Sequence, residues 1–263
     1  MSILDEIVAN KRREVAALRG TVGVDEIVAQ ALSRERPPLF SSVIRSVPMG
    51  LIAEVKRRSP SAGVIREPFD APAIASGYEN AGAQAVSVLM DEQYFGGGVE
   101  DFRSVRDVVG LPMLYKEFVI DPWQVWHARA IGASAVLLIA GVLDVDELRA
   151  FEETARDAGV ECLVEVHDER QMRMARDAGA GLVGVNNRDL KTFTVSLETS
   201  ERLLEYAPGE CTLVSESGIR TAGDVLRVQQ AGFHAVLVGE HLLRERDVGD
   251  AVRVLMGSVW KSS

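Results

Sequence analysis

Five short apolar segments of this chain each end in an acidic, basic or amide side chain. The residues at these ends are Glu54, Lys56, Lys116, Glu165, Asn186 and Glu216. Side chains alternate across a β-strand, so residues i and i+2 point to the same side. In a barrel of parallel strands, the inward side at the carboxyl end faces the active-site mouth. Ammonium and carboxylate groups that meet there can pair, hold charge and exchange protons, so the pattern predicts acid/base chemistry.

The alternative for each residue taken alone is a solvated strand end or a structural ion pair. Agreement across five strands favours a site. Two later segments suggest an anion-binding function beside it: Ser217-Gly218-Ile219, which precedes Thr221 at a predicted helix start, and Gly239-Glu240. Barrels often bind phosphate at these two loops through backbone N–H groups. Two ordinary turns are the alternative, and the nearby lysines favour phosphate.

The elements that must position these residues alternate regularly along the chain. Short runs rich in Val, Ile and Leu predict eight strands at Gly50–Lys56, Ala85–Met90, Pro112–Lys116, Ala135–Ala140, Glu161–His167, Leu182–Asn186, Thr212–Glu216 and Ala235–Gly239. Amphipathic stretches predict helices between and after them at Ala71–Ala81, Val99–Val109, Pro122–Ile131, Val145–Ala158, Glu169–Ala178, Leu197–Tyr206, Ala222–Ala231 and Val248–Leu255. Such alternation predicts an α/β fold with a single (β/α)8 TIM barrel.

Residues 1–47 precede the first predicted strand. Ile3, Leu4, Ile7, Val8, Val15 and Leu18 recur at helical spacing, and a second helical stretch at Asp25–Ser33 ends before Pro37-Pro38. A segment of this length is thin for an independent core. We therefore predict an N-terminal helical extension, residues 1–47, packed on a catalytic barrel of residues 48–263.

Composition limits the functional classes. The 263 residues are 47% hydrophobic and 26% charged, with 39 acidic and 29 basic residues and a formal charge of −10. This charge repels polyanions, so we expect no nucleic-acid partner. No apolar run reaches the ~18 residues that span a bilayer, and no signal-peptide pattern is present, which predicts a cytoplasmic protein without a membrane role. We expect a monomer or a weak homo-oligomer.

Other motifs are less informative. Cys162 and Cys211 each open an apolar run and predict buried free thiols. The four histidines lack metal-ligand spacing, so we expect no metal. The segment from Gly179 to Gly184 satisfies GxGxxG, but it follows a helix and enters a strand, which is the reverse of a dinucleotide site. Gly96-Gly97-Gly98 predicts a flexible active-site loop.

Several segments resemble the signature blocks of the indole-3-glycerol phosphate synthase family, in order and over essentially the whole chain. They are Ile52-Ala-Glu-Val-Lys56-Arg-Arg-Ser-Pro-Ser-Ala-Gly63, Lys116-Glu-Phe118, Leu163-Val-Glu-Val-His167, Gly184-Val-Asn-Asn-Arg-Asp-Leu190 and Val214-Ser-Glu-Ser-Gly-Ile219. The resemblance implies a carboxy-lyase of tryptophan biosynthesis. Its substrate would be 1-(2-carboxyphenylamino)-1-deoxyribulose 5-phosphate, converted to indole-3-glycerol phosphate, CO2 and water without a cofactor.

The resemblance also implies roles for individual residues. Lys116 resembles the general acid that protonates the ketone oxygen, and Glu165 the acid/base group of the later dehydration. Lys56 resembles the residue that binds the carboxylate or phosphate end, with Glu54 orienting the lysines. The remaining residues resemble substrate-positioning and supporting groups (Asn186, Arg188, Glu216), a residue of the mobile loop (Ser59), apolar walls (Phe95, Phe118) and a phosphate cradle (Ser217, Gly218, Gly239, Glu240).

Three positions depart from the family pattern. Glu117 replaces a common aspartate and should point outward, so we give it no weight; Gly98 and Ala62 replace a serine and a lysine that contact the substrate or its loop. Two alternative functions are considered. A phosphoribosylanthranilate isomerase usually has a cysteine at the end of its first strand, where Lys56 stands here, and a non-enzymatic barrel would show eroded strand ends.

Overall fold

The computed structural model describes residues 3–189 and 192–260. Leu190 of the fourth quoted segment, and residues 1–2 and 261–263 of the two predicted regions, lie outside the described residues. In the described part of the chain, parallel strands form a closed barrel in the order β1-β10-β9-β8-β7-β6-β5-β4. The strands are β1 Gly50–Val55, β4 Ala85–Leu89, β5 Met113–Lys116, β6 Ala135–Ile139, β7 Glu161–Val166, β8 Leu182–Asn186, β9 Thr212–Glu216 and β10 Ala235–Val238.

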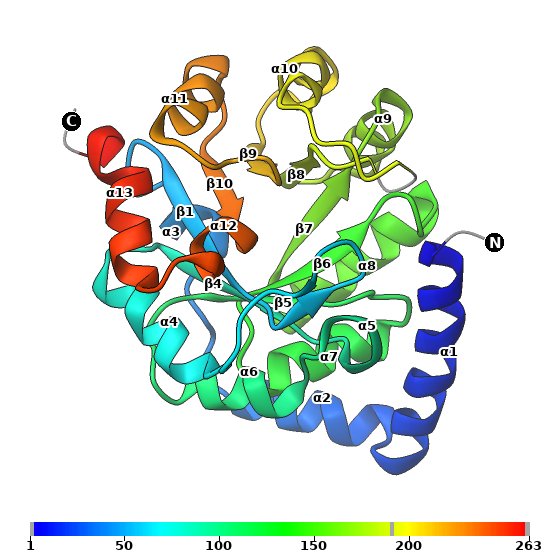
Figure 1. Ribbon diagram of the computed structural model, residues 1–263. Helices are drawn as coiled ribbons and strands as arrows, with labels where there is room; N and C mark the ends of the chain where they lie inside the picture. Colours follow the sequence, from blue (N-terminus) through cyan, green and yellow to red (C-terminus); the bar gives the residue numbers. More distant parts are fainter. Residues whose placement is uncertain (1–2, 190–191, 261–263) are drawn as a thin grey trace.

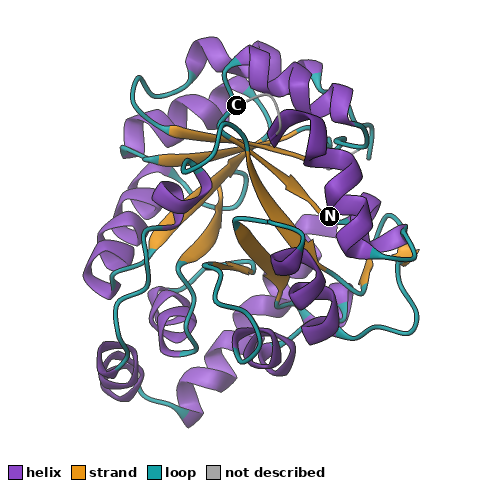
Figure 2. Ribbon diagram, turned by 90° about the vertical axis from the view of Figure 1, so that its left-hand side faces the viewer, coloured by secondary structure: helices purple, strands orange, loops and turns teal. Residues whose placement is uncertain are grey.

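Helices surround these strands (Figures 1 and 2). They are α4 Ala71–Asn80, α6 Val99–Arg106, α7 Pro122–Ala130, α8 Val145–Ala158, α9 Glu169–Ala178, α10 Glu198–Leu203 followed by a 3-10 turn at Leu204–Tyr206, α11 Ala222–Ala231 and α13 Val248–Trp260. The predicted (β/α)8 barrel is confirmed, and each strand agrees with the prediction to within one residue at either end. Gly82, Gly132, Gly179 and Gly232 stand at the ends of four of these helices, and all have positive φ, which is typical of glycine after a helix.

Residues 3–44 contain three helices: α1 Ile3–Thr21, α2 Val24–Ser33 and α3 Phe40–Ile44. In Figure 1, α1 runs along one side of the barrel and α2 lies beneath it. Helix α2 packs on α7 and α8, and the indole N–H of Trp123 donates to the carbonyl of Val22 at 3.0 Å. Helix α3 was not predicted. Its Phe40 and Ile44 are fully buried against inward residues of the barrel, so they close its amino-terminal end.

The sequence also missed short elements in the loops at the carboxyl ends of the strands. These are the hairpin β2 Arg58–Ser59 with β3 Gly63–Val64, and the helices α5 Glu92–Phe95 and α12 Glu240–Arg244. Elements of two to five residues are too short to show a hydrophobic period. No helix in residues 3–189 and 192–260 is both long and apolar enough to cross a membrane.

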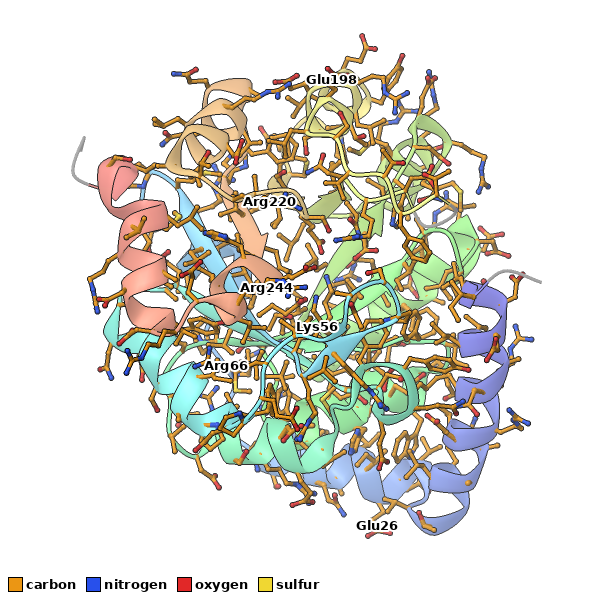
Figure 3. All side chains as sticks on the ribbon, in the orientation of Figure 1. Glu26, Lys56, Arg66, Glu198, Arg220 and Arg244 are labelled. Carbon is orange, nitrogen blue, oxygen red and sulfur yellow. The ribbon has the colours of Figure 1, made fainter. Side chains whose placement is uncertain are left out.

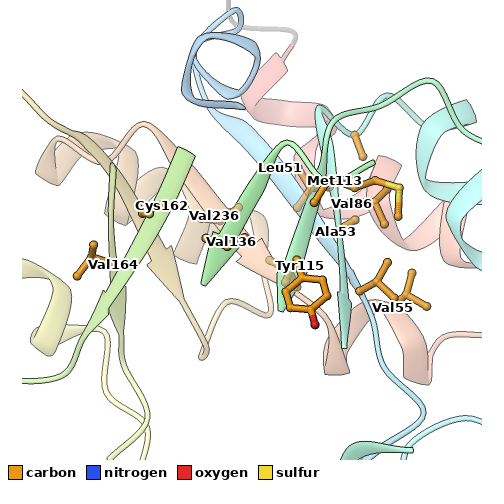
Figure 4. Packing of buried hydrophobic residues seen from close by; sticks show 14 of the residues in the cluster. Leu51, Ala53, Val55, Val86, Met113, Tyr115, Val136, Cys162, Val164 and Val236 are labelled. Atoms are coloured by element: carbon orange, nitrogen blue, oxygen red, sulfur yellow. The ribbon is translucent and has the colours of Figure 1, made fainter. Parts of the chain in front are cut away.

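Two apolar layers hold the barrel together. Outward strand residues such as Leu51, Met113, Val136 and Cys162 pack under the helices (Figure 4). A smaller cluster of inward residues fills the barrel itself. Cys162 and Cys211 are both buried and unbonded to one another, as predicted.

Candidate active site

Inward side chains at the carboxyl ends of the strands are polar, and those below them are apolar. Glu54, Lys116, Glu165, Asn186 and Glu216 lie on β1, β5, β7, β8 and β9. Two residues earlier on four of these strands stand Ile52, Leu114, Leu163 and Val214, all fully buried inside the barrel. The polar groups therefore sit on a dry floor, where electrostatic interactions are stronger than in water.

Lys116 lies between two carboxylates from the opposite side of the barrel. Its Nζ is 3.3 Å from Oε2 of Glu165 and donates a hydrogen bond to Oε2 of Glu216. Asn186 donates from Nδ2 to Oε1 of Glu165 at 3.2 Å. The second lysine, Lys56, directly follows β1 and pairs with Glu54 of that strand at 2.5 Å. The side chains of these two lysines and of Glu54, Glu165 and Glu216 are between 2% and 17% exposed, so their charges are little screened by water.

These contacts separate the proton affinities of the three glutamates. Burial alone would raise the pKa of Glu54 and Glu165. Lys56 and Lys116 together outweigh burial for Glu54, and Lys116, His167 and Asn186 together outweigh it for Glu165, so both pKa values are lowered. For Glu216, burial outweighs Lys116 and raises the pKa to about 8, with the charge of Glu165 adding to the rise. Burial opposes the charge of Lys116, yet Glu216 and Glu165 raise its pKa. The site therefore holds an ammonium beside two carboxyl groups of different proton affinity, of which Glu165 has the lower pKa and Glu216 the higher.

Two inward-facing glycines make room for these carboxylates. A Cβ on Gly184 of β8 would lie 2.1 Å from Oε1 of Glu216, and a Cβ on Gly239 would lie 2.6 Å from Oε1 of Glu54. Contacts below 3.0 Å essentially never occur, so a side chain at either position would displace a glutamate. Sequence reasoning assigned Gly184 no role beyond the rejected GxGxxG pattern.

A cavity of about 540 Å³ opens above the charged cluster. All fourteen residues proposed from the sequence line it: Glu54, Lys56, Ser59, Phe95, Lys116, Phe118, Glu165, Asn186, Arg188, Glu216, Ser217, Gly218, Gly239 and Glu240. The rings of Phe95 and Phe118 stand 6.2 Å apart, centroid to centroid, and form an apolar wall. Within one cavity the protein thus offers an apolar wall, a charged floor and two glycine-containing loops.

Backbone geometry distinguishes the first of these loops. Ser217 and Gly218 have φ of 65° and 85°, and a positive φ is unusual for serine. The buried side chain of Asn187 holds the loop, because its Nδ2 donates to the carbonyl oxygens of Glu216 at 3.0 Å and Ser217 at 3.1 Å. Successive backbone N–H groups in a turn can form a concave site that binds an anion. Asn187 is a supporting residue that sequence reasoning missed.

The second loop leads from Gly239 into α12. Oε1 of Glu240 accepts hydrogen bonds from Nε of Arg244 at 3.0 Å and from its Nη2 at 2.9 Å, and Oε2 lies 3.7 Å from Nη2 of Arg188. The carboxylate of Glu240 is therefore paired with two guanidinium groups. In Figure 3 the side chains of Lys56, Arg220 and Arg244 lie over the central part of the molecule, while Glu26 and Glu198 lie at its periphery.

Several lining residues were not predicted to belong to the site. Arg220 and Arg244 line the cavity beside the phosphate loops. Ile3, Leu4 and Ile7 of α1 also line it. Their helical spacing was visible in the sequence but indicated only packing on the barrel. Which face of α1 reaches over the mouth is decided by tertiary packing.

Glu117, to which we gave no weight above, lines the cavity as well. The residue is 5% exposed and lies beneath α1, where its Oε2 is 2.9 Å from Nζ of Lys11. Lys11 also lies 3.1 Å from Oδ2 of Asp91 and 2.6 Å from Oε2 of Glu14. Burial raises the pKa of Glu117 to about 7 despite Lys11. This buried charge cluster fixes α1 to the ends of β4 and β5, next to Lys116.

The described residues contain no group of three or more His, Cys, Asp or Glu side chains that could hold a metal ion.

Comparisons with known proteins agree on one family. The family model described as indole-3-glycerol phosphate synthase matches residues 4–255. The chain is 45% identical over 255 residues to the indole-3-glycerol phosphate synthase of Desulfotalea psychrophila, covering 96% of this chain and 98% of that protein. It is 42% identical over 258 residues to that of Ruminiclostridium cellulolyticum, covering 97% and 99%.

Solved structures show the fold alone. The thiamine phosphate pyrophosphorylase of Pyrococcus furiosus matches with a TM-score of 0.62 at 16% identity, over 83% of this chain and 98% of that chain. The N-acetylmannosamine-6-phosphate 2-epimerase of Clostridium perfringens matches with a TM-score of 0.61 at 15% identity, over 81% and 94%.

Proposed function

Because this chain belongs to the indole-3-glycerol phosphate synthase family, we propose that its charged cluster carries out that synthesis with Lys116 as the general acid. The enzyme is a carboxy-lyase of tryptophan biosynthesis that acts on a small phosphate substrate. The reaction closes the ring of 1-(2-carboxyphenylamino)-1-deoxyribulose 5-phosphate and releases CO2 and water. A single observation carries the assignment: the ammonium of Lys116 lies between Glu165 and Glu216 on the floor of a cavity whose rim has two phosphate-type loops.

The first step needs a proton donor at the ketone. As the aromatic carbon attacks the carbonyl carbon, negative charge develops on the ketone oxygen, and a positioned ammonium neutralises it. Lys116 is charged before the substrate arrives, because its carboxylate neighbours raise its pKa. Proton transfer of this kind contributes ~10²–10⁴-fold to the rate. Departure of CO2 then restores the aromatic ring without an electron sink.

The later dehydration needs a group that accepts one proton and returns it. Glu165 suits this role, because Lys116 keeps its carboxylate ionised and Asn186 orients it. Lys56, held by Glu54, binds the carboxylate or phosphate end of the substrate. Glu216 and Arg188 position the substrate from the opposite side of the mouth.

The phosphate group belongs at the loops after β9 and β10, with Ser217, Gly218, Gly239 and Glu240. Backbone N–H groups at both loops supply donors to an anion. The pairing of Glu240 with Arg188 and Arg244 offsets the charge of its carboxylate, which would otherwise repel a phosphate. Phe95 and Phe118 form the wall for the aromatic ring, and Ser59 lies at the edge of the cavity in the hairpin after β1.

The decisive assay is incubation of the purified protein with the carboxyphenylamino sugar phosphate while indole fluorescence is followed. Lys116→Ala should retain the native circular dichroism spectrum and lose at least ~100-fold in kcat. Lys56→Ala is the matched variant, and it should raise KM more than it lowers kcat because it removes a binding charge. Near-normal turnover by Lys116→Ala would refute the assignment of Lys116 as the general acid. Absence of product from the unaltered protein would refute the proposed function.

The proposal extends to the setting of the enzyme. Residues 1–47 act as an extension of the catalytic barrel of residues 48–263, which is supported by the packing of α2 on α7 and α8. The protein works in the cytoplasm, as a monomer or a weak homo-oligomer, without nucleic acid; the formal charge of −10 supports the last point.

A further inference from the structure

Glu165 has a third neighbour besides Lys116 and Asn186. Nε2 of His167 lies 3.4 Å from Oε1 of Glu165. His167 follows β7 directly and stands two residues after Glu165, so the two side chains point to the same side of the strand. His167 does not line the cavity.

The surroundings of the ring fix which of its nitrogens carries the proton. Oε1 of Gln171 accepts the backbone N–H of His167 at 2.9 Å and lies 3.3 Å from Nδ1 of the same residue. A backbone N–H can only donate, so this atom of Gln171 is its carbonyl oxygen. A carbonyl oxygen can only accept, so Nδ1 must be the protonated nitrogen of a neutral ring. The backbone N–H of Gln171 is in turn held by Asp168 at 2.8 Å.

This tautomer leaves a lone pair on Nε2 that faces Glu165. Nε2 is buried and makes no hydrogen bond within the described residues. A neutral ring and an ionised carboxylate would then present two acceptors to each other, which is unfavourable in a buried place. A proton on Nε2 turns the same contact into an attraction between opposite charges.

We propose that His167 is a positioning residue of the reaction, which takes up a proton on Nε2 while Glu165 is ionised and thereby keeps that carboxylate ready to accept a proton. The proposal rests on the acid/base role of Glu165 given above. The other titratable groups that face Glu165 are Lys116 on β5, Glu216 on β9 and Glu54 on β1. On the side of α9 the ring meets the uncharged Gln171. His167 is thus a titratable neighbour of Glu165 that lies outside the substrate cavity.

Charge balance sets the direction of the effect. Burial raises the pKa of Glu165. Among the groups that lower this pKa, Lys116 has the largest effect and His167 the second largest. Loss of a titratable ring should raise the pKa of Glu165. A base with a raised pKa needs a higher pH to ionise, so the acid limb of the kcat profile should move to higher pH.

The test compares the unaltered enzyme, His167→Gln and His234→Asn between about pH 3 and 9, because the acid limb set by Glu165 lies below the ordinary glutamate pKa of 4.5. A glutamine amide can still donate to Glu165 but cannot take up a proton, so His167→Gln should shift the acid limb of kcat upward by at least about one pH unit. Its KM and its kcat above the limb should stay within about threefold of the parent values. His234 is the matched control: its Nδ1 accepts the N–H of Leu213 at 3.0 Å at the other end of a strand, and asparagine can replace that acceptor.

Two results would overturn the proposal while the enzyme itself remains active. One is an unmoved acid limb in His167→Gln, with or without a uniform loss of kcat, which would indicate a purely structural residue. The second result would be obtained from nitrogen-15 NMR spectra of histidine-labelled enzyme. These spectra report the tautomer of His167 in the unaltered enzyme, so this part of the test needs no variant. The proposal expects the Nδ1–H tautomer for neutral His167 and a titration of Nε2 that changes in Glu165→Gln; an Nε2–H tautomer or an unchanged titration would contradict it. An inactive parent enzyme would instead refute the assigned function.

Discussion

Gly184→Ala tests whether the charged cluster depends on the space that a glycine provides. The added Cβ would lie 2.1 Å from Oε1 and 3.2 Å from Cδ of Glu216. Carbon and oxygen atoms in contact are separated by roughly 3.5 Å, so the carboxylate must withdraw by more than about 1 Å. Glu216 is 2% exposed and lines the cavity, so its carboxylate can withdraw only toward the cavity or against packed neighbours, and either movement takes it away from its present position. The hydrogen bond from Lys116 to Glu216 should break.

A displacement of this size has a predictable effect on rate and stability. Misplacing catalytic groups by ~1 Å costs about 10²-fold, so we expect kcat to fall about 100-fold. Overpacking a buried site lowers the free energy of unfolding by about 1–3 kcal/mol. The assays are initial rates by indole fluorescence and equilibrium unfolding in urea. Glu216→Asp in the Gly184→Ala background shortens the acid by one methylene group, and it should recover part of the lost stability.

A glycine just before the same strand provides a matched control. Gly181 precedes β8, and a Cβ placed on it would meet nothing within 4 Å. Gly181→Ala should therefore leave kcat unchanged and alter the free energy of unfolding by less than about 1 kcal/mol. If Gly184→Ala kept both the rate and the stability of the parent, Glu216 would not need its present position, and the reasoning about Lys116 would be wrong.

Three further predictions concern regions outside the charged floor. Lys11→Met leaves the carboxylates of Asp91 and Glu117 buried without their partner and should cost about 3–5 kcal/mol in urea unfolding. Arg19→Met removes a more exposed pair of the same helix, with Asp121 at 2.7 Å, and should cost at most about 1 kcal/mol; equal losses would contradict the argument. Glu152→Gln should change the pH dependence of stability, because burial raises the pKa of Glu152 to about 7 despite Arg156. The folded state favours the neutral acid, so the contribution of Glu152 is present below the ordinary glutamate pKa of 4.5 and is lost as pH rises through about 7. Calorimetric Tm values of Glu152→Gln should gain on the parent across that window, and a constant difference would disprove the assignment. Arg220→Gln should raise KM about tenfold with little change in kcat, because it removes a charge at the phosphate end. A fall in kcat alone would place Arg220 in the chemical step.

The order of strands and helices followed from the sequence because each element is long enough to show its own period. A run such as Leu182–Asn186 is apolar on both faces, as a barrel strand must be, and α8 has the spacing of a helix with one buried side. The short elements did not follow. Helix α3 has five residues and packs on β1 and β4, and the β2–β3 hairpin pairs only two residues of each strand, so neither element shows a hydrophobic period of its own.

The inward direction of the polar strand ends also followed from the sequence, because the two-residue alternation of a strand is independent of its surroundings. What surrounds those ends did not. The sequence contained both Lys11 and Glu117 without indicating that residues 106 positions apart meet under α1.

The sequence by itself determined the barrel, the polar residues that end its strands and the family to which the chain belongs, since these depend on local period and residue type. Only the tertiary structure decided that the pKa of Glu216 is higher than that of Glu165, that Gly184 makes room for Glu216 and that His167 lies next to Glu165. Proton affinity and space depend on distances between segments far apart in the chain, and those distances are set by packing.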